Sequence, residues 1–118
     1  MRPILAALFA LLAAPVAAQD FVPVTDRGTF LQLVDGRELH LGRFGVNIRV
    51  RADGLIEGSA VGWDLTGTWS WQDGYFCRDM DWSGTPIPYN CQLVEAAADQ
   101  VRFTVDQGAG DSAVFRLR

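Results

Sequence analysis

The sequence predicts a mainly β protein: a small antiparallel β-barrel or sandwich of about seven to eight strands, preceded by one short α-helix. Three observations support this fold class. Short segments of alternating apolar and polar residues recur along the chain, Gly and Asp residues separate most of them, and a single stretch has helical spacing. Short strands joined by tight turns at regular intervals are typical of closed barrels and small sandwiches.

The residues over 1–18 are typical of a secretory signal peptide. A positive charge at Arg2 precedes an apolar run over 4–12, and Val16, Ala17 and Ala18 fit the small-residue cleavage pattern. The run is shorter than the roughly 20 residues that a membrane-spanning helix needs. We therefore expect a mature chain from near Gln19, with no membrane span, in the periplasm or secreted.

The remaining residues, 19–118, have the length of a single secreted β domain. The chain of 118 residues has fourteen acidic and ten basic side chains and a net charge of −4, and every cation apart from its one His is Arg. Nucleic-acid binding needs a basic surface, so we expect no nucleic-acid partner. The expected partner is an unknown small molecule or an envelope protein.

Two cysteines, Cys77 and Cys91, allow only one intramolecular pairing. An even number of Cys residues in an exported chain predicts a disulfide bond. Closing a loop of about 15 residues would stabilise the fold by roughly 3 kcal/mol. A thiol metal site is the competing interpretation, but two Cys and a distant His40 do not supply four ligands at a recognised spacing. We predict no metal and no cofactor.

The helix is predicted over Thr25–Gly36, where Thr25 or Asp26 caps its start and a Gly ends it. A first strand follows over 38–41 and a second over 46–51. The next turn contains Asp53 and Gly54, a strong hairpin signal. A three-residue loop over 52–54 pairs Val50 with Ile56 and Arg49 with Glu57, which separates apolar from polar side chains, so this register is preferred.

A second hairpin joins strands over 65–72 and 75–82 through a two-residue loop of Asp73 and Gly74. This register places Trp69 opposite Arg78, and its aromatic side chains share one face. We expect a Gly- and Pro-rich loop over 83–90 next. Three more strands are expected over 91–96, 100–105 and 113–117, and a plain hairpin loop over 106–111.

Four residues on the apolar face of the second hairpin are candidate ligand-binding residues: Trp69, Trp71, Arg78 and Trp82. A guanidinium of Arg78 over the Trp69 indole would contribute about 0.5–2 kcal/mol. In one interpretation this face lines a ligand cup, in which Arg78 suits an anionic head group. In the other it is the core with Arg78 at the rim, which we favour because core aromatic residues are more common.

Three functional hypotheses follow. The first is a non-catalytic periplasmic binding or interaction module. The second is a small periplasmic enzyme that uses His40, the one His of the chain, with an acid. The third is an inhibitor or accessory protein that docks through an aromatic-rich rim. No catalytic residue is predicted, because no nucleophile motif accompanies His40, and Asp79 and Asp81 lie on a solvated face.

Four segments carry a resemblance to known proteins: Gly62–Trp63, Leu65–Arg78, Asn90–Gln92 and Arg102–Thr104. Together they resemble a group of small exported proteins of alphaproteobacteria, some of which are named dihydrodipicolinate reductase. The residues do not support a reductase activity here, because the chain lacks the strand–helix G-x-G-x-x-G fingerprint of nicotinamide-binding domains. The G-T-W segment with its downstream Cys pair is also similar to small calycin-like periplasmic barrels, which implies a barrel fold.

Overall fold

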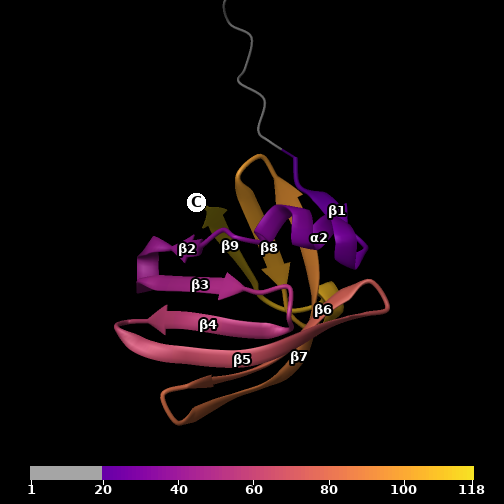
Figure 1. The fold of residues 1–118 in the computed structure, drawn as a ribbon. Coiled ribbons are helices and arrows are strands. Elements are labelled where there is room, and N and C mark those ends of the chain that lie inside the picture. The colour runs from indigo at the N-terminus through magenta and orange to yellow at the C-terminus, as the bar shows by residue number, and fades with distance from the viewer. Residues whose placement is uncertain (1–19) are drawn as a thin grey trace, which may run out of the picture.

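The strands of the computed structural model close into an eight-stranded antiparallel β-barrel, with a ninth strand at its edge (Figure 1). The structure describes residues 20–118, so the predicted signal peptide over 1–18 lies outside the described residues. Around the barrel the strands follow the order β7-β6-β5-β4-β3-β2-β9-β8, and pairing of β8 with β7 closes the ring. The strands are β1 (Val22–Val24), β2 (Leu39–Leu41), β3 (Val46–Val50), β4 (Leu55–Ala60), β5 (Trp63–Gln72), β6 (Tyr75–Trp82), β7 (Thr85–Ala97), β8 (Gln100–Thr104) and β9 (Ser112–Leu117).

Both predicted hairpin registers are confirmed. Val50 pairs with Ile56 across the turn that contains Gly54, which has a positive φ of 90°. Trp69 pairs with Arg78 across the two-residue turn between β5 and β6. Because side chains alternate along a strand, these registers decide which residues of four consecutive strands face the barrel interior.

The predicted loop over 83–90 is wrong. A two-residue turn, Ser83 and Gly84, leads directly into β7, whose first half pairs with β6. This half carries Pro86 and Pro88, and the register with β6 shifts between Arg78 and Met80. Proline is tolerated on edge strands and at irregularities of this kind, because no ladder hydrogen bond is lost there.

The second half of β7 has β8 on one side and β1 on the other. Val24 of β1 pairs with Val94, so β1 lies beyond the closed ring. β1 is absent from the sequence-based prediction, because a three-residue strand that contains Pro23 shows no measurable alternation.

Two glycines allow strands β4 and β5 to curve. A Cβ on Gly58 would overlap the Asn47 carbonyl oxygen, and one on Gly67 would lie 2.5 Å from the Asp79 carbonyl oxygen. Neither position has room for a side chain. Glycine at such points marks a tight bend where another backbone approaches closely.

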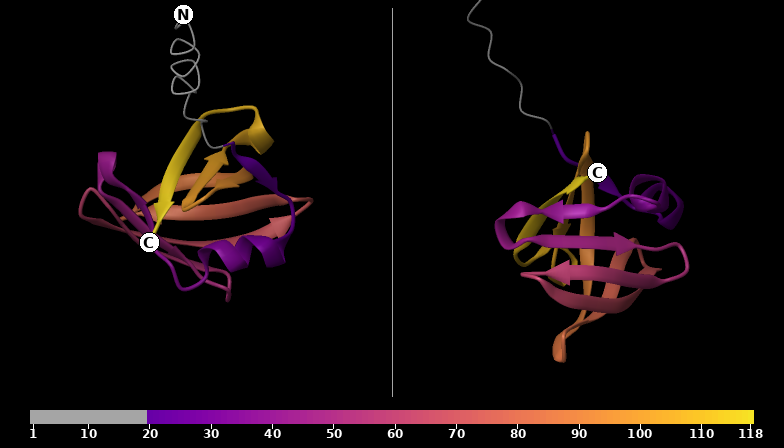
Figure 2. Two further views of the ribbon diagram at one scale, coloured as in Figure 1. Left: turned by 90° about the horizontal axis from the view of Figure 1, so that it is seen from above. Right: turned by 60° about the vertical axis from the view of Figure 1, so that its left-hand side comes forward.

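Helix α2 (Arg27–Val34) lies at one end of the barrel (Figure 1, Figure 2). It begins as predicted at Asp26, whose carboxylate accepts hydrogen bonds from the backbone N–H and the hydroxyl of Thr29. Phe30 and Val34 are both fully buried. The helix therefore presents its apolar face to the barrel interior and closes this end.

Phe30 is the centre of an aromatic cluster. Its ring centroid lies 5.5 Å from that of Trp69, 5.1 Å from those of Trp71 and Phe76, and 6.2 Å from that of Phe103. Aromatic pairs at such distances stabilise beyond their burial by about 0.5–1.5 kcal/mol each. The closed end of the barrel is thus a packed aromatic core.

We predict that Phe30→Ala lowers the free energy of unfolding by about 3–5 kcal/mol, because it leaves a cavity at the centre of this cluster. Phe44→Ala is the matched control, since Phe44 is 57% exposed, and it should have a much smaller effect. Urea unfolding followed by Trp fluorescence measures both. Equal midpoints for the two variants would contradict the central role of Phe30.

We also predict that the contribution of Asp26 to stability depends on pH. The backbone hydrogen bond from Thr29 holds the pKa of Asp26 below its ordinary value of 3.8. A lowered folded-state pKa stabilises the fold above the unfolded-state pKa, and this contribution is lost as the pH falls through the folded-state pKa. Asp26→Ala should therefore lower the urea midpoint at about pH 7, with wild type and variant converging in strong acid. Asp20→Ala, ahead of β1, is the control; a pH-independent difference for Asp26→Ala would contradict the prediction.

Candidate functional site

A cavity of about 500 Å³ occupies the half of the barrel opposite α2. Its inner part is lined by side chains next to the aromatic core, including Val50, Ile56, Phe76 and Phe103. Its mouth lies among the turns at the other end, where Phe44 and Val61 both line the cavity and are 57% and 62% exposed. The barrel is therefore packed at one end and hollow at the other.

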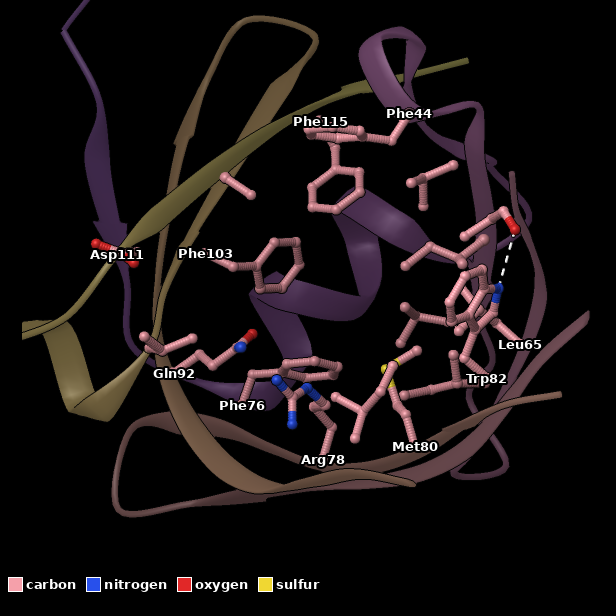
Figure 3. Close-up of a pocket in the computed structure, with 18 of the residues that line it drawn as sticks. Phe44, Leu65, Phe76, Arg78, Met80, Trp82, Gln92, Phe103, Asp111 and Phe115 are labelled. Atoms are coloured by element: carbon pink, nitrogen blue, oxygen red, sulfur yellow. Dashed lines mark hydrogen bonds between the residues drawn. The ribbon is translucent and has the colours of Figure 1, made fainter. Parts of the chain in front are cut away.

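Strand β6 supplies one wall of the cavity. Phe76, Arg78, Met80 and Trp82 occupy alternate positions of the strand, and all four line the cavity (Figure 3). The strand runs from the closed end to the mouth, so Arg78 is the first lining residue after the buried Phe76. The Trp82 indole N–H donates to the Ala60 carbonyl at 2.9 Å, which fixes that ring against β4.

The four predicted ligand-binding residues divide into two pairs. Arg78 and Trp82 line the cavity, whereas Trp69 and Trp71 lie at the closed end against Phe30. The Trp69 indole donates to the Arg51 carbonyl and the Trp71 indole to the Thr25 carbonyl. The aromatic face is thus divided: its residues near α2 belong to the core, and those near the mouth line the cavity.

The predicted stacking of Arg78 on Trp69 is wrong, although the two residues pair across the strands. The guanidinium over Trp69 is that of Arg27 in α2, 5.2 Å from the ring centroid. Arg78 instead donates to the Pro88 carbonyl at 2.6 Å. Arg27 reaches Trp69 only because the helix docks on this end of the barrel.

Arg78 is a half-buried cation in a largely apolar wall. Among residues 20–118 no carboxylate lies within 4.0 Å of it, since each of the ion pairs found there involves another Arg: Arg51, Arg102 or Arg118. Burial lowers the pKa of Arg78, and the nearby charge of Asp79 offsets part of that effect. The guanidinium remains charged at neutral pH.

Three turns shape the mouth. The 3₁₀ helix η2 (Gly42–Phe44) carries Phe44, whose carbonyl accepts from the backbone N–H of Val61 in the next turn. Val61 has a φ of 52°, which is unusual for a β-branched residue and costs free energy. The loop with η3 (Asp106–Gly108) is tied to β7 by reciprocal hydrogen bonds between Asn90 and Asp106.

The predicted disulfide is confirmed: Cys77 and Cys91 are directly opposite on β6 and β7 and are bonded. Their side chains alternate with the inward-pointing Arg78 and Gln92, so the bond lies on the outer side of the same two strands. The cross-link holds β6 and β7 together where both contribute polar side chains to the cavity.

His40 lies on the outer face of β2, between the inward-facing positions of Leu39 and Leu41. Its Nδ1 atom is 2.6 Å from Oδ1 of Asn47, a side-chain amide and not a carboxylate. It is not among the residues that line the large cavity. The structure therefore does not bring His40 together with Arg78 or the tryptophans.

Two further features concern metals and membranes. Within residues 20–118 no cluster of three or more His, Cys, Asp or Glu side chains has the geometry of a metal site. In the same part of the chain, no helix combines the length and apolar character that crossing a bilayer requires.

Several cavity residues are missing from the sequence-based site, among them Gln92, Phe103 and Phe115. Phe103 and Phe115 occupy alternating positions in strands that the sequence does predict, so their inward orientation was detectable. Their position opposite β6 was not detectable from the sequence, because it depends on closure of the barrel through β8 and β9.

Comparison of the chain with protein-family models, with curated proteins and with solved structures gave no match.

We predict that removing the disulfide in Cys77→Ala/Cys91→Ala lowers the free energy of unfolding by about 3 kcal/mol, because the unfolded chain gains the freedom of the open loop. Urea unfolding of the variant and of oxidised wild type measures this difference. Reduced wild type is the control and should behave like the variant. Unchanged midpoints after reduction would contradict the prediction.

Proposed function

We propose that this protein is a non-catalytic binding module that holds a small, mostly apolar molecule in its barrel cavity. The observation that carries the proposal is the cavity of about 500 Å³ opposite α2. Ligand pockets typically measure about 300–1,000 Å³ and combine apolar walls with a few polar groups that orient the ligand. Arg78 and Gln92 are polar groups of this kind in a wall formed mainly by aliphatic and aromatic side chains.

We further propose that the module works in the periplasm. The signal-like residues over 1–18 support export. The bond between Cys77 and Cys91 also fits an oxidising compartment, where disulfides form and persist.

One observation favours a second candidate function, that of an inhibitor or accessory protein. Phe44, Val61 and Trp63 are exposed at or beside the mouth, which gives this end an apolar rim suited to a protein partner. Native mass spectrometry of protein purified from the periplasm separates the two candidates. A bound small molecule supports the binding module, and a bound protein supports the second candidate. No contact in the described structure favours the alternative in which His40 acts with an acid as an enzyme.

We predict that wild-type protein binds the neutral fluorescent probe phenylnaphthylamine saturably and that Ala60→Phe weakens this binding by about tenfold. Ala60 lines the cavity, and forcing extra atoms into a filled site costs about 1–3 kcal/mol. Ser59→Phe is the matched control, because Ser59 lies on the outer face of the same strand, beside Asn47 and Glu57. Equal affinities for the two variants, or no binding by wild type, would contradict the proposed site.

A further inference from the structure

We propose that the ligand is a single-chain amphiphile with an anionic head group, a carboxylate, which binds against Arg78 while its apolar chain lies along the apolar wall of the cavity. This inference rests on the proposed binding function and adds the chemical class and the orientation of the ligand. It is carried by the position, the hydrogen bonding and the surroundings of one side chain.

Arg78 is half-buried in the cavity wall, and its partner across the strands, Asn90, is hydrogen-bonded to Asp106 of the η3 loop at the mouth. Phe76, the preceding inward residue of β6, touches the aromatic core with its ring centroid 5.1 Å from that of Phe30. Trp82, four residues further along the strand, lies next to the turn at the mouth. At about 3.3 Å per residue, the backbone at Arg78 is about 13 Å from that at Trp82, a distance that an extended acyl chain of medium length can span.

The hydrogen-bonding capacity of Arg78 is mostly unused. A guanidinium has five N–H donors in a planar fork that matches a carboxylate. One hydrogen bond, from Nη1 to the Pro88 carbonyl at 2.6 Å, holds the side chain in place. In the part of the chain that the structure describes, no carboxylate lies within 4.0 Å of the guanidinium. The remaining donors are available to a ligand.

A second polar side chain lies near the first. Gln92 on β7 is 7% exposed and lines the same cavity. It pairs with Phe76, whereas Arg78 pairs with Asn90, so Gln92 and Arg78 occupy diagonal positions on adjacent strands (Figure 3). Side chains at such positions are within reach of one another. The Gln92 amide is thus placed to donate to the same head group.

The surroundings favour an anion at this place. Phe103, Met80 and Ile87 line the cavity around these two polar residues, and in such low-dielectric surroundings charges attract more strongly than in water. Two nearby acidic residues, Asp79 and Asp111, form no ion pair with Arg78. Asp79 occupies an outward position of β6, and Asp111 lines the cavity from the β8–β9 loop. A carboxylate on an apolar chain complements both the cation and the wall.

The test compares three amphiphiles with similar chains: decanoate, decanol and decyltrimethylammonium. Displacement of bound phenylnaphthylamine measures the affinity of each amphiphile for wild type, for Arg78→Gln and for the control Arg116→Gln. The side chain of Arg116 is on the outer face of β9. We expect wild type to bind decanoate most tightly. Arg78→Gln should weaken decanoate binding by about tenfold to a hundredfold, the effect of losing a hydrogen bond to a charged group, and leave decanol binding nearly unchanged. Arg116→Gln should match wild type.

Equal affinities of wild type for decanoate and decanol would overturn the inference while leaving the proposed binding function intact. An equal loss of both ligands in a folded Arg78→Gln variant would also overturn it. Failure of wild type to bind any of the amphiphiles or the probe would overturn the binding function itself. If circular dichroism shows that Arg78→Gln is unfolded, Arg78→Lys replaces it. That variant keeps the charge and should keep a preference for decanoate over decanol, and loss of that preference would overturn the inference.

Discussion

Phe30 is fully buried among the rings of Trp69, Trp71, Phe76 and Phe103, and this contact organises the whole barrel. An eight-stranded barrel has an interior just wide enough to be filled by side chains or to hold one small ligand. Here the side chains of α2 fill the barrel interior at one end only. Because the aromatic residues gather around the helix, the empty volume is confined to the other half, where the mouth lies.

Strand β6 connects the stability of the barrel with its site. Alternation along the strand sends Phe76, Arg78 and Trp82 inward, while Cys77 points outward and is cross-linked to β7. One strand therefore joins the aromatic core, carries the cation of the cavity and bears the disulfide. Rigid strands hold site residues more precisely than loops do, so the cation occupies a well-defined position.

Local patterns in the sequence account for much of this arrangement. The registers at Gly54 and Gly74 are predictable, because turn chemistry and alternation are properties of neighbouring residues. The division of the aromatic face into core and cavity wall is not predictable from the sequence, because it depends on where α2 docks. For the same reason Arg27, far from Trp69 in sequence, takes the place expected for Arg78. The first half of β7 escapes prediction because its prolines are typical of loops, and only pairing with β6 makes it a strand.

Holding Arg78 in an apolar wall costs stability. A half-buried cation with no carboxylate partner among residues 20–118 loses part of its hydration, which a single carbonyl hydrogen bond does not fully restore, and a small domain has a margin of only about 5–15 kcal/mol. A residue chosen for stability alone at this position would be apolar, like its neighbours Phe76 and Met80 on the inner face of β6. Binding sites commonly retain such a cost, because the free energy of binding returns stability when the ligand is present. Under the proposed binding function, the unpaired cation has its physical rationale in the ligand-bound barrel.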